Sequence, residues 1–329
     1  MNQLIVSSRV RLARNISDVP FKTQDPDAFD SIAVTLQQKN PDLKNVARIE
    51  RLPQKMAQSL FERHLISREL LKNKTNGIIV AATEDKQNKV CVMFGEEDHI
   101  RIQVIRQGLN LTEAFATAKK LSADIERNHK IAHHKKLGYL TSCVTNLGTG
   151  MRASVMMFLP ALTQTGYINQ AVSELRARRI TVRGVYGEGS EAAGFMYQIS
   201  NQACLGLTEE QIIEMVANEV RWLAAAEFDM QARLAQADYD GILNKVMQAY
   251  GILTNSHMIA SAQAVELLSW LKLGDCLGLV RFKPRVLDDL FFVTQPASVT
   301  HTIEQEDIRS RDKARAKKLA DELLRGRIK

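Results

Sequence analysis

The sequence predicts an α+β fold in which an antiparallel sheet flanked by helices is followed by an all-helical segment. In the first two-thirds, short β-branched or apolar runs alternate with amphipathic stretches, whereas only helical spacing occurs after Thr208. Few helices separate the extended runs, which favours a mixed or antiparallel sheet over a doubly wound parallel one. The 329 residues, of which 45% are apolar, are enough for one large domain or two ordinary ones.

The elements of the first two-thirds follow from these patterns in order. Helical spacing is found at 26–38, 54–71, 111–128 and 167–178. Extended runs are found at 77–82, 90–94, 137–140, 154–159, 180–185 and 195–199.

The last third begins with a helix-initiation signal. Thr208 is followed three residues later by Gln211, which is the pattern of a capping box, and an amphipathic run continues with few breaks to about residue 250. Helical spacing returns at 260–271, 284–290 and 303–324. We expect a boundary within 225–236, which gives domains of residues 1–228 and 229–329.

Composition excludes several classes of protein. The chain carries 44 Lys and Arg against 37 Asp and Glu, a net charge of +7 that favours an anionic partner. No apolar run approaches the ~18–20 residues of a membrane span, and arginines occupy the place of a signal peptide's apolar region, so we expect a cytoplasmic protein. The scattered cysteines Cys91, Cys143, Cys204 and Cys276 predict neither a metal site nor a disulfide framework.

Neither of two common nucleotide-binding motifs is supported by the sequence. No Walker A sequence is present. Residues 187–192 match G-x-G-x-x-A after a predicted strand, but Glu209 and Glu210 downstream belong to a helix cap instead of ending a second strand, so a Rossmann domain is disfavoured.

Arginines next to glycine-rich or acidic turns are the most informative feature. Arg9 and Arg11 alternate, so both project from one side of an extended strand. Arg101 follows three consecutive acidic residues, and Arg152 ends a glycine-rich turn. Arg183 precedes a turn that contains a glutamate. Each alone is typical of a solvated surface. Together they predict an anion cradle facing a general base, because guanidinium groups bind phosphate oxygens bidentately.

The segments SSRVRLAR (7–14), GEEDHIRIQ (95–103), GYLTSCVTNLGTGMRAS (138–154) and RGVYGEGSE (183–191) carry a family resemblance. In this order they resemble the ATP:guanidino phosphotransferase (phosphagen kinase) superfamily, and within it the bacterial protein arginine kinases of the McsB type. YGILTNSHMIAS (250–261), LKLGDCLGL (271–279) and RDKARA (311–316) are similar to the C-terminal half of that kinase.

The resemblance implies an ATP-dependent kinase that uses Mg²⁺ and phosphorylates arginines exposed on protein substrates. It implies that Glu97 and Glu188 are the catalytic carboxylates and that Cys143 lies beside the acceptor guanidinium. It also implies a set of nucleotide-binding residues: Ser7, Arg9, Arg11, His64, Arg101, Arg152 and Arg183. No resident metal site is expected.

The C-terminal motif Arg311, Asp312 and Arg315 resembles an allosteric phosphoarginine-binding site, although composition alone would favour a solvated charged helix. The resemblance further implies dimerisation through the helical domain and a zinc-binding activator protein. It implies that targets are stress-response repressors and damaged proteins marked for a Clp-type protease. Neither a membrane nor a nucleic acid is an expected partner.

This chain departs from the family pattern at three places. Its SSRVR motif starts at Ser7, which predicts an acceptor pocket open enough for an arginine on a protein surface. Gly95 stands where the family commonly has Asn, and Val144 where many members have Pro. Because a net charge of +7 is poorly matched to arginine-rich targets, we also predict a local acidic surface around the acceptor pocket.

Three alternatives stay open at this point. They are a kinase of small guanidino compounds, a catalytically silent scaffold that binds phosphoarginine, and a nucleic-acid-binding protein. The last is motivated by net charge alone.

Overall fold

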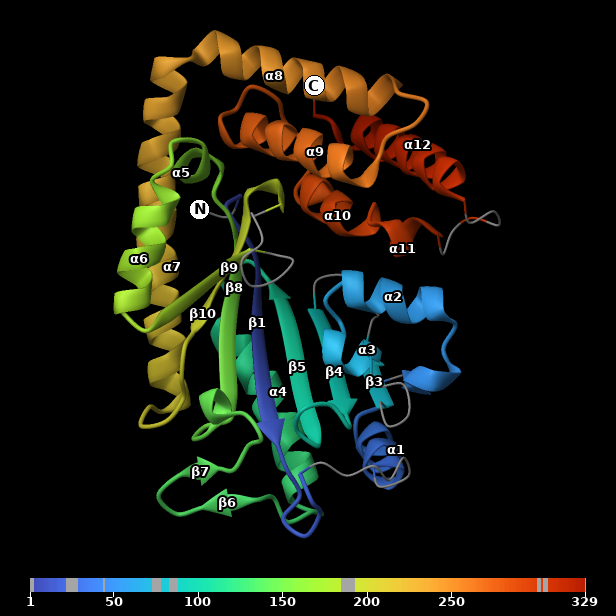
Figure 1. The fold of residues 1–329 in the computed structure, drawn as a ribbon, viewed down its shortest axis with the longest axis vertical. Helices are drawn as coiled ribbons and strands as arrows, with labels where there is room; N and C mark the ends of the chain where they lie inside the picture. The colour runs from blue at the N-terminus through green and yellow to red at the C-terminus, as the bar shows by residue number, and fades with distance from the viewer. Residues whose placement is uncertain are drawn as a thin grey trace.

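The computed structural model describes residues 3–21, 29–43, 45–72, 78–82, 88–184, 193–300, 303 and 307–328. Within this part of the chain, an eight-stranded sheet lies below a group of helices formed by the C-terminal third (Figure 1). The α+β prediction is confirmed.

Every neighbouring pair in the large sheet is antiparallel, and the strand order is β2-β3-β4-β5-β1-β8-β10-β9. A separate two-stranded ribbon projects beyond one end of the sheet (Figure 1). The strands are β1 (Ile5–Arg14), β2 (Asn45–Arg48), β3 (Ile78–Ala82), β4 (Asn88–Phe94), β5 (Ile100–Gln107), β6 (His133–His134), β7 (Gly138–Tyr139), β8 (Met151–Phe158), β9 (Ile180–Gly184) and β10 (Met196–Asn201).

The helices of the first two-thirds are α1 (Asp30–Lys39), α2 (Gln54–Glu62), α3 (Arg68–Lys72), α4 (Leu111–Glu126), α5 (Pro160–Gln164) and α6 (Ile168–Ala177). Those of the last third are α7 (Glu209–Ala237), α8 (Tyr239–Asn255), α9 (Ser261–Cys276), α10 (Val286–Val293), α11 (Pro296–Thr300) and α12 (Ile308–Gly326). None of the helices in the described ranges combines the length and apolarity needed to cross a bilayer.

One face of the sheet is covered by helices and the other carries the polar site. Val10 and Leu12 of β1 are buried in the same core as Leu121 and Ile125 of α4, and α7 packs on β8 and β10. Successive side chains of a strand point to opposite faces, so Arg9 and Arg11 project from the face that α4 does not cover. The alternation of apolar and basic residues in β1 therefore fixes where the site lies.

The helix α7 joins the sheet to the C-terminal helices. It begins with the predicted capping box, in which the backbone N–H of Gln211 donates to Thr208 Oγ1 and that of Thr208 to Gln211 Oε1. Its 29 residues run without a break through the predicted boundary at 228/229 (Figure 1). The division into domains 1–228 and 229–329 stays a prediction, and one hydrophobic core continues across it.

Two predicted helices are interrupted. The run 54–71 divides into α2 and α3 because His64 adopts a left-handed backbone conformation with φ 58°. The helix predicted to continue to about residue 250 divides at Asp238 into α7 and α8. The side chain of Asp238 accepts a hydrogen bond of 3.1 Å from the backbone N–H of Gly241 and so caps α8. The strands β2, β5 and β6 were not predicted. The start of the helix predicted at 26–38 lies outside the described residues.

Candidate active site

Four arginines gather on the open face of the sheet. Arg9 and Arg11 lie on β1, Arg101 on β5 and Arg152 on β8, so that three adjacent strands contribute. Arg11 is directly opposite Arg152 in the antiparallel register. Like charges directly opposite each other destabilise a sheet, so this pair has a cost unless an anion lies between the strands.

The electrostatics of these side chains show how closely they interact. Burial lowers the pKa of Arg9 to about 10, and Arg152 and Arg101 act in the same direction. The pKa of Arg11 lies well below its ordinary value, first because of burial and then because of Arg9, Arg101 and Arg152. Burial followed by Arg183 of β9 also lowers the pKa of Arg152. The predicted arginines therefore form one electrostatic group.

The hydrogen bonds of this group are incomplete. Arg152 donates a hydrogen bond of 2.9 Å to Ser200 Oγ, and Arg9 donates one of 3.4 Å to Ser154 Oγ. The Nε of Arg11 and that of Arg152 are buried and have no hydrogen-bond partner in the part of the chain that the structure describes. Buried donors without acceptors are costly, which makes this surface suited to phosphate oxygens.

The turn between β4 and β5 supplies the carboxylates. Gly95 begins it with φ 71°, a left-handed conformation that glycine adopts without a steric penalty. The side chain of Glu96 is buried and forms an ion pair with Arg101 Nη1. Glu97 forms an ion pair of 3.2 Å with Arg101 Nη2, and 41% of its side chain is exposed. Glu97 is therefore the carboxylate of this turn that a ligand can reach.

A buried aspartate fixes the turn to the loop that carries Cys143. Asp98 Oδ1 accepts a hydrogen bond of 2.8 Å from Asn15 Nδ2 and one of 2.7 Å from the backbone N–H of Ser142. Asn15 also donates a hydrogen bond of 3.1 Å to the carbonyl of Leu140 and accepts one of 2.8 Å from the backbone N–H of His99. The network holds the end of β1, the acidic turn and the cysteine loop in one arrangement.

These parts surround a cavity of about 200 Å³. Its lining contains Arg11, Glu97, Arg101, Cys143, Arg152 and Arg183, together with Ala13, Glu69, Thr145, Asn146 and Gly150. The fold thus brings together six of the predicted site residues. Glu188 lies outside the described residues. Glu69 of α3 was not predicted, because nothing in its local sequence distinguishes it from a solvated helix residue.

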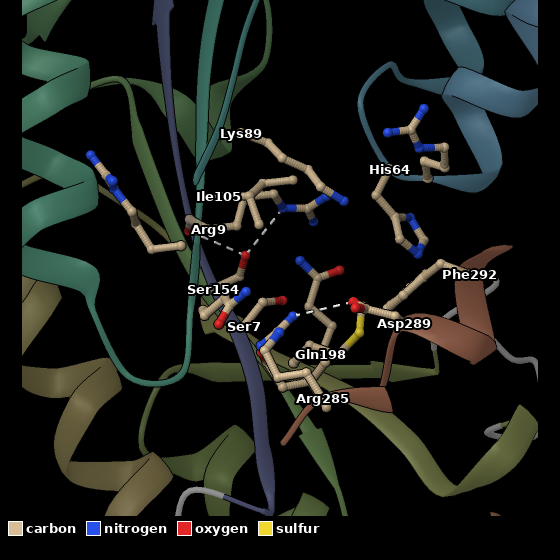
Figure 2. Close-up of a pocket in the computed structure, with 15 residues that line it drawn as sticks. Ser7, Arg9, His64, Lys89, Ile105, Ser154, Gln198, Arg285, Asp289 and Phe292 are labelled. Atoms are coloured by element: carbon tan, nitrogen blue, oxygen red, sulfur yellow. Dashed lines mark hydrogen bonds and ion pairs between the residues drawn. The ribbon is translucent and has the colours of Figure 1, made fainter. Parts of the chain in front are cut away.

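The other predicted nucleotide-binding residues line an adjoining pocket. Ser7, Arg9 and His64 lie there with Lys89, Arg285 and Phe292, among others (Figure 2). Burial lowers the pKa of His64 to about 3, and Arg9 and Lys89 act in the same direction, so the imidazole is neutral at physiological pH. The two pockets follow each other along β1, from Ser7 in this one to Ala13 in the cavity beside Glu97.

The C-terminal motif lies on α12, away from both pockets. Arg315 is 2% exposed. Its guanidinium donates a hydrogen bond of 2.7 Å to the carbonyl of Thr294 and one of 2.8 Å to that of Ile259, and it forms an ion pair with Asp312. Arg311 is half-buried on the same helix. In this arrangement Arg315 ties α12 to two neighbouring loops, and its role in binding phosphoarginine stays a prediction.

Comparison with known proteins identifies the family. Residues 29–230 match the ATP:guanido phosphotransferase catalytic domain, and residues 240–327 match the C-terminal domain of the protein-arginine kinase McsB. The chain belongs to the protein-arginine kinase family of ATP:guanido phosphotransferases. The family prediction is confirmed.

Curated relatives match along nearly the whole chain. A protein-arginine kinase of Geobacillus sp. (strain WCH70) is 41% identical over 304 residues, which are 90% of this chain and 83% of the relative. That of Clostridium novyi (strain NT) is 34% identical over 331 residues, covering 98% and 95%. The crystal structure of a lombricine kinase shares the fold, with a TM-score of 0.60, 24% identity and coverage of 70% and 68%.

Proposed function

We propose that this kinase transfers the γ-phosphoryl group of ATP to the guanidinium groups of arginines on proteins. The single observation that supports this most is the shared cavity, where the basic cluster, Glu97 and Cys143 meet. The names of the relatives agree with an arginine acceptor. The roles that follow are those the site chemistry favours.

The basic cluster would bind the phosphates of ATP. Phosphoryl transfer proceeds through a loose transition state in which charge spreads over the phosphoryl oxygens, so in-line positioning and charge neutralisation contribute most of the catalysis. Arg11 and Arg152 present buried N–H donors from opposite strands. These fixed donors need little reorganisation as charge moves toward the bridging oxygen of ADP.

Glu97 would orient and deprotonate the acceptor, with Glu188 as the second carboxylate. A guanidinium has a pKa above about 12 and becomes nucleophilic only when a nitrogen is aimed and a proton removed. In the proposed step the nitrogen–phosphorus bond forms, the bond from the γ-phosphorus to the bridging oxygen breaks, and the proton passes to a carboxylate. Phosphoarginine and ADP are the products. Cys143, held by the Asp98 network, would contact the planar guanidinium.

Magnesium enters the proposal as part of the nucleotide substrate. Among the described residues, no group of three His, Cys, Asp or Glu side chains is placed to hold a metal ion. Mg²⁺ usually keeps several waters and binds through substrate phosphates plus one or two carboxylates, so the arginine-lined cavity fits a magnesium–nucleotide complex. Its chemistry would be to neutralise phosphate charge.

The biological setting is also part of the proposal. The family resemblance supports a homodimeric enzyme that marks damaged proteins for a Clp-type protease, controls stress-response repressors and responds to a zinc-binding activator. It also supports Arg311, Asp312 and Arg315 as a phosphoarginine-binding motif, in which Arg315 would have to exchange a carbonyl partner for the phosphoryl group.

The test is incubation of the purified protein with MgATP and an arginine-rich protein, followed by mass spectrometry under non-acidic conditions. We expect acid-labile phosphate on arginine with the wild type and at least a hundredfold slower labelling, about 10²- to 10⁴-fold, with Glu97→Gln. Free arginine serves as a parallel substrate. Label on free arginine alone would instead indicate a kinase of small guanidino compounds, and MgADP binding without any label would indicate a silent scaffold.

A further inference from the structure

The pocket beside the basic cluster has a wall from the C-terminal helices. Asp289 and Phe292 line it from α10, and Arg285 lines it from the position just before this helix, facing Ser7 and Arg9 of β1 (Figure 2). The helix α10 lies within the match to the McsB C-terminal domain and outside the match to the phosphotransferase catalytic domain. Residues far apart in sequence therefore share one pocket.

Contacts from α10 and from the residues on either side of it hold this wall against β1 and the α2 segment. Arg285, in a left-handed conformation with φ 73°, directs Nη1 to 3.5 Å from the carbonyl of Val6 on β1. The ring of Phe292 meets His64 edge-on with centroids 5.7 Å apart. The carboxylate of Glu62 on α2 accepts hydrogen bonds of 2.9 Å and 2.8 Å from the backbone N–H groups of Ala297 and Ser298, which lie in α11 just after α10. The wall is thus fixed to the segment that carries His64.

The chemistry of this pocket suits the nucleoside end of a nucleotide. Phe292 and the neutral His64 ring offer flat surfaces, and apolar atoms come from Ile105 and Met156. Asp289 is a carboxylate in a lining otherwise rich in Lys and Arg, and its side chain is 57% exposed. A carboxylate at this position can accept from sugar hydroxyls, as acidic residues do in other nucleotide sites.

Space is available because two hollows adjoin. The inner pocket measures about 60 Å³ and shares Arg63, Lys89, Asp289 and Phe292 with an outer cleft of about 530 Å³ between α2, α10 and α12. Small-molecule sites commonly occupy about 300–1,000 Å³. A nucleoside would extend from the inner pocket into this cleft, displacing the Phe292 side chain outward.

We propose that α10 completes the nucleotide site, with Phe292 contacting the base and Asp289 accepting from the ribose. This inference rests on the proposed function, since it takes ATP as the ligand. The C-terminal helices then determine nucleotide affinity directly, in addition to any role in assembly.

The test compares MgADP with Mg-tripolyphosphate, which lacks a nucleoside, by isothermal titration calorimetry on the full chain. We expect Asp289→Ala to weaken MgADP binding about fivefold to tenfold, as for loss of one or two hydrogen bonds, and to leave tripolyphosphate binding unchanged or tighter. Removing a negative charge by itself would tighten both ligands, so the two explanations predict opposite signs. Phe292→Ala is expected to weaken MgADP alone.

Asp321→Ala is the matched control, because Asp321 is an exposed carboxylate on α12 that lines neither the inner pocket nor the outer cleft. We expect it to bind both ligands as the wild type does. Wild-type MgADP affinity in both α10 variants would overturn this inference while leaving the proposed function intact. Failure of the wild type to bind either ligand would overturn both. Asp289 is exposed, so its variant keeps the test decisive if Phe292→Ala does not fold.

Discussion

Replacing Arg11 with methionine is expected to stabilise the ligand-free protein while removing about half or more of its stabilisation by MgADP. The Nε of Arg11 has no hydrogen-bond partner among the described residues, and the side chain faces Arg152 across the strands. Cross-strand pairs contribute about 0.2–1 kcal/mol, and like charges directly opposite each other are destabilising. Arg9 and Arg101 add to the repulsion, which Glu96 offsets in part. Methionine keeps the unbranched shape, so we expect a gain of about 1 kcal/mol, or roughly 2 °C in Tm.

The ligand response should move the other way. MgADP at a hundred times its Kd stabilises the wild type by about 2.7 kcal/mol. Loss of a charged hydrogen bond costs about 1.5–3 kcal/mol, which raises Kd about 10- to 100-fold. At the same concentration the variant would gain only about 0.4–1.4 kcal/mol. Thermal unfolding with and without MgADP, followed by circular dichroism, measures both effects.

Arg315→Met is the control, because its guanidinium is also buried but is bonded to the carbonyls of Thr294 and Ile259. Leaving these acceptors unpaired should destabilise the protein by about 2–4 kcal/mol. The reasoning is refuted if Arg11→Met loses stability in the ligand-free state, or if it keeps the full MgADP response.

Three further outcomes are expected. Glu97→Gln should lower the rate of arginine phosphorylation about 10²- to 10⁴-fold with little change in MgADP affinity, and a parallel loss of binding would count against a role as base. Asp98→Ala removes the acceptor for Ser142 and Asn15, so it should raise KM for the protein substrate, destabilise the fold by about 2 kcal/mol and spare MgADP affinity; unchanged kinetics would contradict the positioning role. The folded-state pKa of His64 lies at about 3, below its unfolded value, so its contribution to stability is complete above about pH 6.5 and decreases as the pH falls toward 3. Urea unfolding of His64→Gln between pH 7 and 4 should therefore show a shallower loss of stability than the wild type, and equal slopes would show that another group is responsible.

Local patterns predicted most strands of the sheet and which arginines of β1 share a face, for physical reasons, while the roles of these arginines stay predictions. The alternation in β1 determines which side chains share a face, so Arg9 and Arg11 could be grouped before the fold was known. The sequence could not predict that Arg11 and Arg152 are opposed, because register depends on pairing between strands about 140 residues apart. The same limit applies to Glu69, which reaches the cavity from α3.

Errors in helix boundaries also have identifiable causes. The break at His64 follows from a left-handed residue inside an amphipathic pattern, which periodicity does not detect. Asp238 and Gly241 could have indicated a new cap, but the helical spacing on both sides concealed it. The wall formed by Asp289 and Phe292 had no local signal, since their segment resembles an ordinary buried helix.

The uninterrupted α7 has a mechanical consequence. At about 1.5 Å per residue its 29 residues form a rod of about 43 Å that packs on β8 and β10 and continues to α8. A helix resists bending far more than a loop, so the C-terminal helices cannot swing freely on a tether. Cutting the chain near residue 228 to obtain a minimal enzyme would divide this rod and remove α10 from the pocket beside His64.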